Sequence, residues 1–411
     1  MFLYSYKTTA NNILLFLLVF YIFFSSILGS VEVYLILSVS CLLLFNGYKI
    51  NYCYTLGFFP FRIYCYIIFF LVIHFYFTPF KSESFLLGTL TTLLLGIVLI
   101  QKINYDVIEK WIFVWGGVHL FFGFWNLLSF SSLYSLIHYF LPEKVLIAMQ
   151  AFHVEGRNTG INSQTFPLAF YLIQTLGVLF IKYRNRINWK IFFYILMILF
   201  VLFTTSRRGA LLFSFIGIFF CWGISRRYSL IKYVAIGFGL LMGIVLIIKA
   251  LSGLGIDFQI FDRFDISEIS FSDYNALNEL SSSRLSLIIN AYDFFCERPL
   301  FGQGFKFFYN TIGQDVHNTY LQFICESGII GSIVMLSFFL FNIYKTVLFM
   351  RLQNFVDNEI IFSFYGQLFF LVMCFIENPF SDRYFFLSYI ISVSFIYKRL
   401  LQDKLKSCCS N

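Results

Sequence analysis

The chain has 411 residues, of which 59% are hydrophobic and only 12% are charged. This composition excludes a soluble domain, in which about 25% of residues are charged. The 59 Phe and 27 Tyr residues provide bulky apolar area for lipid contact and for the aromatic belts at membrane boundaries. The net charge of +8 does not call for a nucleic-acid partner, because basic residues also gather on the cytoplasmic loops of membrane proteins. With no Ser/Gly-rich linker, residues 1–411 are expected to form a single polytopic membrane domain.

Apolar runs recur along the chain at the length of a membrane span. Roughly 17–25 apolar residues cross a hydrocarbon core of about 30 Å as an α-helix. Helices are required because an open sheet would leave backbone groups unpaired in lipid. The sequence therefore predicts an all-α fold with about twelve transmembrane helices. They are expected near residues 11–28, 31–47, 58–78, 84–101, 107–128, 163–181, 189–205, 208–224, 229–249, 318–348, 359–376 and 383–400.

The distribution of basic residues predicts the orientation of these helices. Cytoplasmic loops retain an excess of Lys and Arg. Placing both termini in the cytoplasm puts the clusters at Lys182–Lys190, Arg226–Lys232 and Lys398–Lys406 on the cytoplasmic side. The opposite, external face then carries the segments 129–162, Thr204–Arg208, 250–317 and Glu377–Arg383.

The external segment 250–317 is the one long loop of soluble character, and its second half is predicted to contain an amphipathic helix. The hydroxyls of Ser281–Ser283 are suitable N-caps, and Pro299 is expected to end the helix. Of the nine cysteines only Cys296 lies in this loop, so no disulfide scaffold is expected. The predicted apolar face consists of Leu285, Ile288, Ile289, Tyr292 and Phe295. Such a helix would lie across the mouth of the bundle.

Four arginines on the external face oppose the usual charge bias. Arg157 lies in Gly-Arg-Asn-Thr-Gly-Ile, Arg207 and Arg208 lie in Thr-Ser-Arg-Arg-Gly, and Arg284 occupies the first turn of the loop helix. Taken singly, each suits a contact with lipid phosphate or a snorkelling side chain. Four together, each beside a Gly, Ser or Thr, predict a phosphate-binding ring. The planar guanidinium group holds two phosphate oxygens at once and stays protonated.

A second group of polar residues follows the loop helix. Gly302 and Gly304, in Pro-Leu-Phe-Gly-Gln-Gly-Phe, permit backbone conformations closed to other residues and could bring main-chain donors near a ligand. This Gly-x-Gly is a weak signal because it lacks the strand and helix of a nucleotide-binding fold. His317 lies at the external end of a predicted span, where an imidazole can accept a proton near neutral pH. A purely structural role for His317 is the alternative.

Glu326 is a carboxyl group placed within a predicted span. A charged group there is costly enough to be a functional candidate. Pairing with Arg207 or Arg208 is the compensation that the sequence predicts.

In order along the chain, these motifs resemble the superfamily of O-antigen polymerases and O-antigen ligases. The shared pattern is Gly-Arg-x-x-Gly, Thr-Ser-Arg-x-Gly, Ser-x-Arg with Pro-Leu-x-Gly-x-Gly, and His-Asn-x-x-Leu-Gln-x-x-x-Glu-x-Gly-x-x-Gly. The resemblance covers roughly residues 150–335, with a family-like core expected over 163–348, and is most specific at 317–331. One departure is the doubled arginine, which leaves open whether Arg207 or Arg208 faces the site.

The resemblance implies a glycosyltransferase that uses no nucleotide sugar, metal or other cofactor. Its donor would be an oligosaccharide on undecaprenyl pyrophosphate, and the protein would lie in the bacterial inner membrane. Further implied partners are membrane lipid and a chain-length regulator protein, without nucleic acid. The expected catalytic residues are His317 as base, Arg284 and Glu326. The expected substrate-binding residues are Arg157, Arg207, Arg208, Asn318, Gly302 and Gly304.

Three functions stay open on the sequence alone. A polymerase would join lipid-linked repeat units on the periplasmic side. Polymerases of the superfamily that the chain resembles tend to be very aromatic, as this chain is, and this likeness favours the polymerase. A ligase would transfer the glycan to the lipid A core. A lipid-linked glycan transporter is the third reading, but transporters usually bind substrate near mid-membrane, whereas the polar residues here gather at one face.

The predicted topology can be tested with reporter fusions. A reporter fused after residue 275 should read periplasmic, and reporters fused after residues 187 and 228 should read cytoplasmic, because the basic clusters stay inside. A cytoplasmic signal at residue 275 would overturn the topology and the external site with it.

Overall fold

The computed structural model describes residues 2–28, 59–184, 188–207, 284–353 and 356–409, with single residues and short stretches between 209 and 220. In these residues the α-helix is the only regular secondary structure. The helices are α1 (Phe2–Leu28), α4 (Phe59–Phe77), α5 (Glu83–Lys102), α6 (Tyr105–Leu128), α7 (Phe130–Ile137), α8 (Glu143–Val154), α9 (Thr165–Tyr183), α10 (Trp189–Thr204), α15 (Arg284–Glu297), α16 (Phe307–Ile312), α17 (Thr319–Leu352), α18 (Asn358–Met373) and α19 (Arg383–Cys409). The predicted all-α fold is confirmed for this part of the chain.

Within the described residues, six helices are long and apolar enough to cross a membrane: α1, α5, α6, α9, α17 and α19. The shorter apolar helices are α4, α10 and α18. All of these coincide with predicted spans, so the protein is a multi-pass membrane protein. The predicted spans at 31–47 and 229–249, and most of the one at 208–224, lie outside the described residues.

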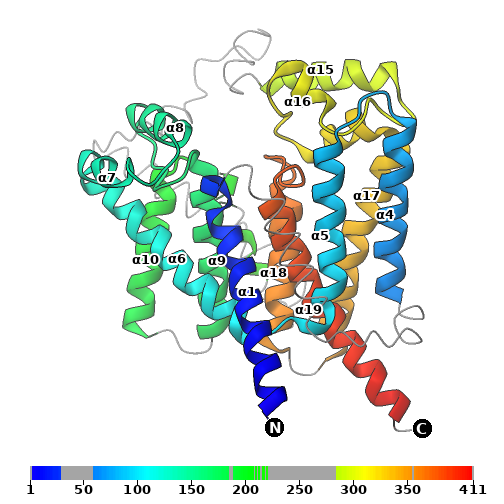
Figure 1. Ribbon diagram of the computed structural model, residues 1–411, viewed down its shortest axis with the longest axis horizontal. Helices are drawn as coiled ribbons and strands as arrows, with labels where there is room; N and C mark the ends of the chain where they lie inside the picture. Colours follow the sequence, from blue (N-terminus) through cyan, green and yellow to red (C-terminus); the bar gives the residue numbers. More distant parts are fainter. Residues whose placement is uncertain are drawn as a thin grey trace.

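Both ends of the chain lie at one end of the helix bundle, and α7, α8, α15 and α16 lie at the other (Figure 1). The start of α17 and the segment that joins α18 to α19 also lie at this second end. The described parts of the four segments expected on one face are thus found together. The assignment of that face to the periplasm stays a prediction from the charge pattern.

Helix α9 forms the centre of the bundle and packs against α6, α10 and α18. Its neighbours approach closely because small residues lie at the contacts. A Cβ at Gly177 would lie 2.2 Å from the ring of Tyr365, whose hydroxyl donates to the Ile173 carbonyl at 3.0 Å. A Cβ at Gly116 would lie 1.8 Å from the Thr175 hydroxyl. These contacts fix α6 and α18 against the central helix.

The predicted loop helix is α15, which lies across the end of the bundle (Figure 1). It ends at Glu297, two residues before Pro299, as expected. The predicted apolar face is wrong, because Leu287 and Ala291 are the buried residues, whereas Tyr292 is 64% exposed. Ile288 and Ile289, from the same predicted face, are also exposed. Leu287 and Ala291 pack with Phe308, Val316 and Cys325, a contact that helical periodicity alone does not specify. Ser281–Ser283 lie outside the described residues.

The loop after α15 is inserted into a break in α17. Gly328 has φ 64° and ψ −168°, which interrupts the helix. Backbone groups of the loop pair with the freed groups of α17 on both sides of the break. These bonds are Gln303 N–H to Cys325 O (3.1 Å), Gly304 N–H to Glu326 O (2.8 Å), Ile329 N–H to Pro299 O (2.8 Å) and Ile330 N–H to Leu300 O (3.2 Å). The loop and the helix therefore form one hydrogen-bonded unit.

Replacing Gly302 tests this insertion. Gly302 has φ +68°, and a Cβ there would lie 2.5 Å from the carbonyl carbon of Glu326. Gly302→Ala should therefore destabilise the protein by about 2–5 kcal/mol through backbone strain and overlap. The control is Gly313→Ala. Gly313 also has a positive φ, of +81°, but a Cβ added there would meet no atom within 4 Å. Only the backbone strain of about 1–2 kcal/mol is therefore expected in this variant. Thermal unfolding in detergent measures both, and equal midpoints would contradict the prediction.

Candidate functional site

A buried carboxylate, Glu377, gathers charged side chains from three distant parts of the chain. It lies between α18 and α19 and is only 8% exposed. Its Oε1 accepts a hydrogen bond from Arg207 Nη1 at 2.7 Å and lies 3.9 Å from Arg284 Nη2. Its Oε2 lies 3.0 Å from His317 Nδ1. Three of the predicted site residues thus meet at one carboxyl group.

The charges around Glu377 determine its ionisation. Burial alone would raise the pKa of the Glu377 carboxyl, but the hydrogen bond with His317 and the positive charges of Arg207 and Arg284 lower it below its ordinary value. The group is therefore a carboxylate at neutral pH. A carboxylate only accepts hydrogen bonds, so His317 Nδ1 is the donor, and in the neutral imidazole the lone pair is on Nε2. The His317 side chain is 37% exposed.

The start of α17 positions His317. Its φ of +55° is unusual for a residue with a side chain, and it directly precedes the helix cap Asn318. Asn318 accepts from the first turn of α17, and its amide donates to the Phe375 carbonyl at 3.2 Å. The Thr319 N–H donates to the Cys374 carbonyl at 2.8 Å. These bonds fix His317 relative to the segment that carries Glu377, and they occupy the side chain of Asn318.

Arg207 connects two parts of the bundle. It follows the end of α10, and its Nε donates to the Thr165 hydroxyl at 2.8 Å, at the start of α9. Its guanidinium carbon lies 5.7 Å from the centre of the Phe166 ring. The pair with Glu377 then links α9 and α10 to the segment between α18 and α19.

The other two predicted arginines are Arg157 and Arg208. Arg157 forms an ion pair with Glu155 at 3.1 Å. The next residue, Asn158, donates its N–H to the Thr204 carbonyl at 3.1 Å, which places this segment beside the end of α10. Arg208 lies outside the described residues.

The fold itself explains the two glycines of the Gly-Gln-Gly turn. The Gly302 N–H donates to the Arg298 carbonyl at 2.9 Å, and the Gly304 N–H donates to Glu326 O at 2.8 Å. Both donors therefore already have acceptors within the protein. A Cβ at Gly304 would lie 2.2 Å from the Phe80 carbonyl oxygen, so only glycine fits there.

Glu326 lies apart from this cluster. Of its two predicted partners, Arg207 is wrong, and Arg208 lies outside the described residues. The carboxyl group accepts from the Phe308 N–H at 3.2 Å and from Gln322 Nε2 at 2.9 Å, and the residue is 2% exposed. Arg207 pairs with Glu377 instead. The reason is position: Glu326 lies nearly two turns into α17 and packs against α16, whereas Arg207 reaches the start of the helix. A catalytic role for Glu326 stays a prediction.

Sequence reasoning placed Glu377 on the correct face but did not select it. A usable signal exists, because clustered cations at a membrane boundary need a counter-charge. Spacing along the chain does not identify which acid provides it.

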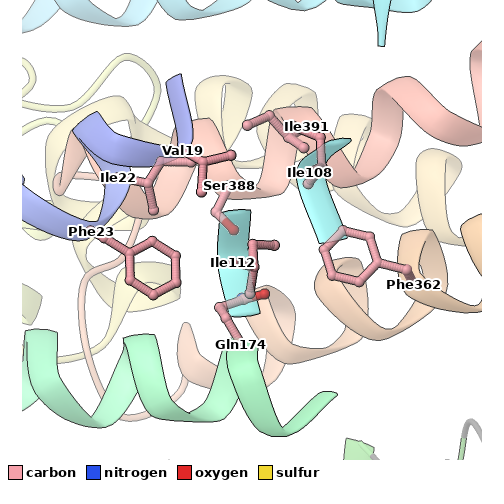
Figure 2. A pocket seen from close by; sticks show the side chains of 9 residues that line it. All are labelled: Val19, Ile22, Phe23, Ile108, Ile112, Gln174, Phe362, Ser388 and Ile391. Atoms are coloured by element: carbon pink, nitrogen blue, oxygen red, sulfur yellow. The ribbon is translucent and has the colours of Figure 1, made fainter. Parts of the chain in front are cut away.

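A small cavity lies elsewhere, among α1, α6, α9, α18 and α19 (Figure 2). Its volume of about 10 Å³ is near the minimum for one water molecule, so it cannot hold a glycan. It is lined by Val19, Ile22, Phe23, Ile108, Ile112, Gln174, Phe362, Ser388 and Ile391. No group of three or more His, Cys, Asp or Glu side chains suited to a metal ion occurs in the described parts of the chain.

The chain is similar to a known family over part of its length. The family described as O-antigen ligase matches residues 192–336. The matched region contains Arg207, Arg284 and His317 and ends before Glu377. Among curated proteins, none matches the sequence significantly.

Proposed function

Because residues 192–336 belong to the superfamily of O-antigen polymerases and O-antigen ligases, we propose that this membrane protein is a glycosyltransferase that polymerises surface polysaccharide. Its substrates are oligosaccharide repeat units linked to undecaprenyl pyrophosphate, on the periplasmic side of the inner membrane. The family match fits a polymerase and a ligase equally, and the aromatic-rich composition favours the polymerase. The match gives no support to the transporter alternative.

The contact between His317 and Glu377 is the observation that carries this proposal. It places an imidazole, whose Nε2 carries the lone pair in the neutral form, next to the guanidinium groups of Arg207 and Arg284. In the proposed reaction, Nε2 takes the proton of the acceptor hydroxyl as its oxygen bonds to the anomeric carbon of the donor. The bond from that carbon to the pyrophosphate breaks at the same time, so the configuration inverts and the lipid pyrophosphate leaves.

The arginines supply the positive charge that a leaving pyrophosphate requires. Arg284 suits this task because its side chain is 38% exposed and its contact with Glu377 is long, at 3.9 Å. Its guanidinium donors are therefore accessible for phosphate oxygens. In the proposal, Arg157, Arg207 and Arg208 complete the positive lining.

The position of the cluster agrees with a lipid-linked donor. The cluster lies at one end of the apolar bundle, where α15 crosses it (Figure 1). A pyrophosphate at the membrane surface would reach this end while its polyprenyl tail stays in lipid. Membrane lipid and a chain-length regulator protein remain proposed partners.

A deletion strain separates the two transferases. Loss of a polymerase should leave single repeat units attached to the core, visible as one band on a lipopolysaccharide gel. Free lipid-linked polymer together with bare core would identify a ligase instead. An unchanged ladder of chain lengths would contradict both.

His317→Ala tests the base. The purified variant should bind lipid-linked donor with near-normal affinity, because the arginines remain, yet turn it over at least about a hundredfold more slowly. The matched control is His138→Ala, since His138 is exposed at the same end of the protein, with a contact to the Ser135 carbonyl at 3.3 Å. Wild-type turnover by the His317 variant at saturating donor and acceptor would refute the base assignment.

A further inference from the structure

We propose that Glu377 is a positioning residue that holds His317 in the tautomer with a free Nε2. The inference rests on the proposed function and adds a residue that lies outside the matched region 192–336. It follows from the contacts of the two carboxylate oxygens.

The two carboxylate oxygens of Glu377 contact different partners. Oε1 lies 2.7 Å from Arg207 Nη1, and Oε2 lies 3.0 Å from His317 Nδ1. A guanidinium group only donates, so it fixes the carboxylate on one side. Arg207 is itself held by the Thr165 hydroxyl at 2.8 Å. The orientation of the carboxylate toward His317 is therefore set by Arg207 and Thr165, which lie outside the pair of His317 and Glu377.

The backbone near Glu377 is fixed as well. The Thr319 hydroxyl contacts the Glu377 carbonyl and the Asn378 side-chain oxygen, both at 3.1 Å. The Glu377 N–H donates to the Met373 carbonyl at 2.9 Å. Because Thr319 follows His317 by two residues, the same contacts hold both partners of the pair. Such preorganisation is what a positioning residue requires.

The carboxylate also fits the charge changes of the reaction. When His317 takes the acceptor proton it becomes an imidazolium, which the adjacent carboxylate stabilises. The two arginines keep the carboxylate ionised, so the proton stays on His317 until the product leaves.

Glu377→Gln tests this role, because the new side chain has nearly the same size but replaces one acceptor oxygen with an NH₂ donor. Arg207 can donate only to the amide oxygen of the new side chain. The amide NH₂ group of that side chain therefore faces His317 Nδ1. His317 must then accept at Nδ1 and carry its hydrogen on Nε2, which blocks the base. We expect kcat to fall by about 10²–10⁴ while lipid-linked donor binds at least as tightly.

The matched control is Glu359→Gln. Glu359 lies at the other end of α18, and its side chain is 16% exposed, against 11% for Glu377. It also has two basic partners, Lys398 and Arg399, each at 3.8 Å. This variant should keep wild-type kcat and donor affinity.

A double-mutant cycle shows whether Glu377 acts through His317. In a His317→Ala background, Glu377→Gln should lower kcat less than about twofold. The full single-variant loss in that background would mean a merely structural role and would overturn the inference. If Glu377→Gln does not fold, Glu377→Asp is the second variant, because it keeps the charge but withdraws the carboxylate from His317. Its kcat should fall about 10²-fold. A wild-type kcat in this variant would overturn the inference.

The outcomes also separate this inference from the proposed function. A wild-type protein that transfers no glycan from lipid-linked donor to acceptor refutes both. A wild-type protein that is active, together with an equally active Glu377→Gln variant, refutes the positioning role alone.

Discussion

A buried carboxylate at a membrane boundary must be neutralised, and this requirement organises the external end of the protein. Removing an unpaired charge from water costs several kcal/mol. Glu377 meets the requirement with Arg207, Arg284 and His317, which follow α10, begin α15 and precede α17. Helices that are distant in sequence are thereby held at one point. The same contacts that stabilise the carboxylate gather the groups of the proposed chemistry, so stability and function have a common origin here.

The second organising feature is the loop at Pro299–Gly304, which completes the hydrogen bonds of the broken helix α17. His74 contributes from α4, since its Nε2 lies 2.9 Å from the Phe301 carbonyl oxygen. The Phe80 N–H donates to the Gln303 carbonyl at 3.1 Å. The loop is thus attached to α17 and to the connection between α4 and α5. This attachment makes α15, which the loop follows, part of the rigid framework around the site.

Much of the fold could be predicted because the spans depend only on the length and composition of apolar runs. Part of the site could also be predicted, because the motifs that carry Arg207, Arg284 and His317 are shared with the superfamily and were placed on one face of the membrane. Features that depend on tertiary contact were missed. The buried face of α15 is set by Phe308, Val316 and Cys325, which come from other segments. The partner of Glu326 is decided by α16, and the importance of Glu377 becomes visible only when three segments converge.

The order in which the cluster residues occur along the chain has a consequence for biosynthesis. Arg207, Arg284 and His317 are translated before Glu377, which follows α18. The ribosome therefore delivers the cations to the membrane first and their counter-charge last. Until α18 has been inserted, the cations repel one another and the imidazole has no carboxylate to orient it. Assembly of the site is thereby coupled to nearly complete synthesis, and a nascent chain interrupted before this point lacks an organised centre.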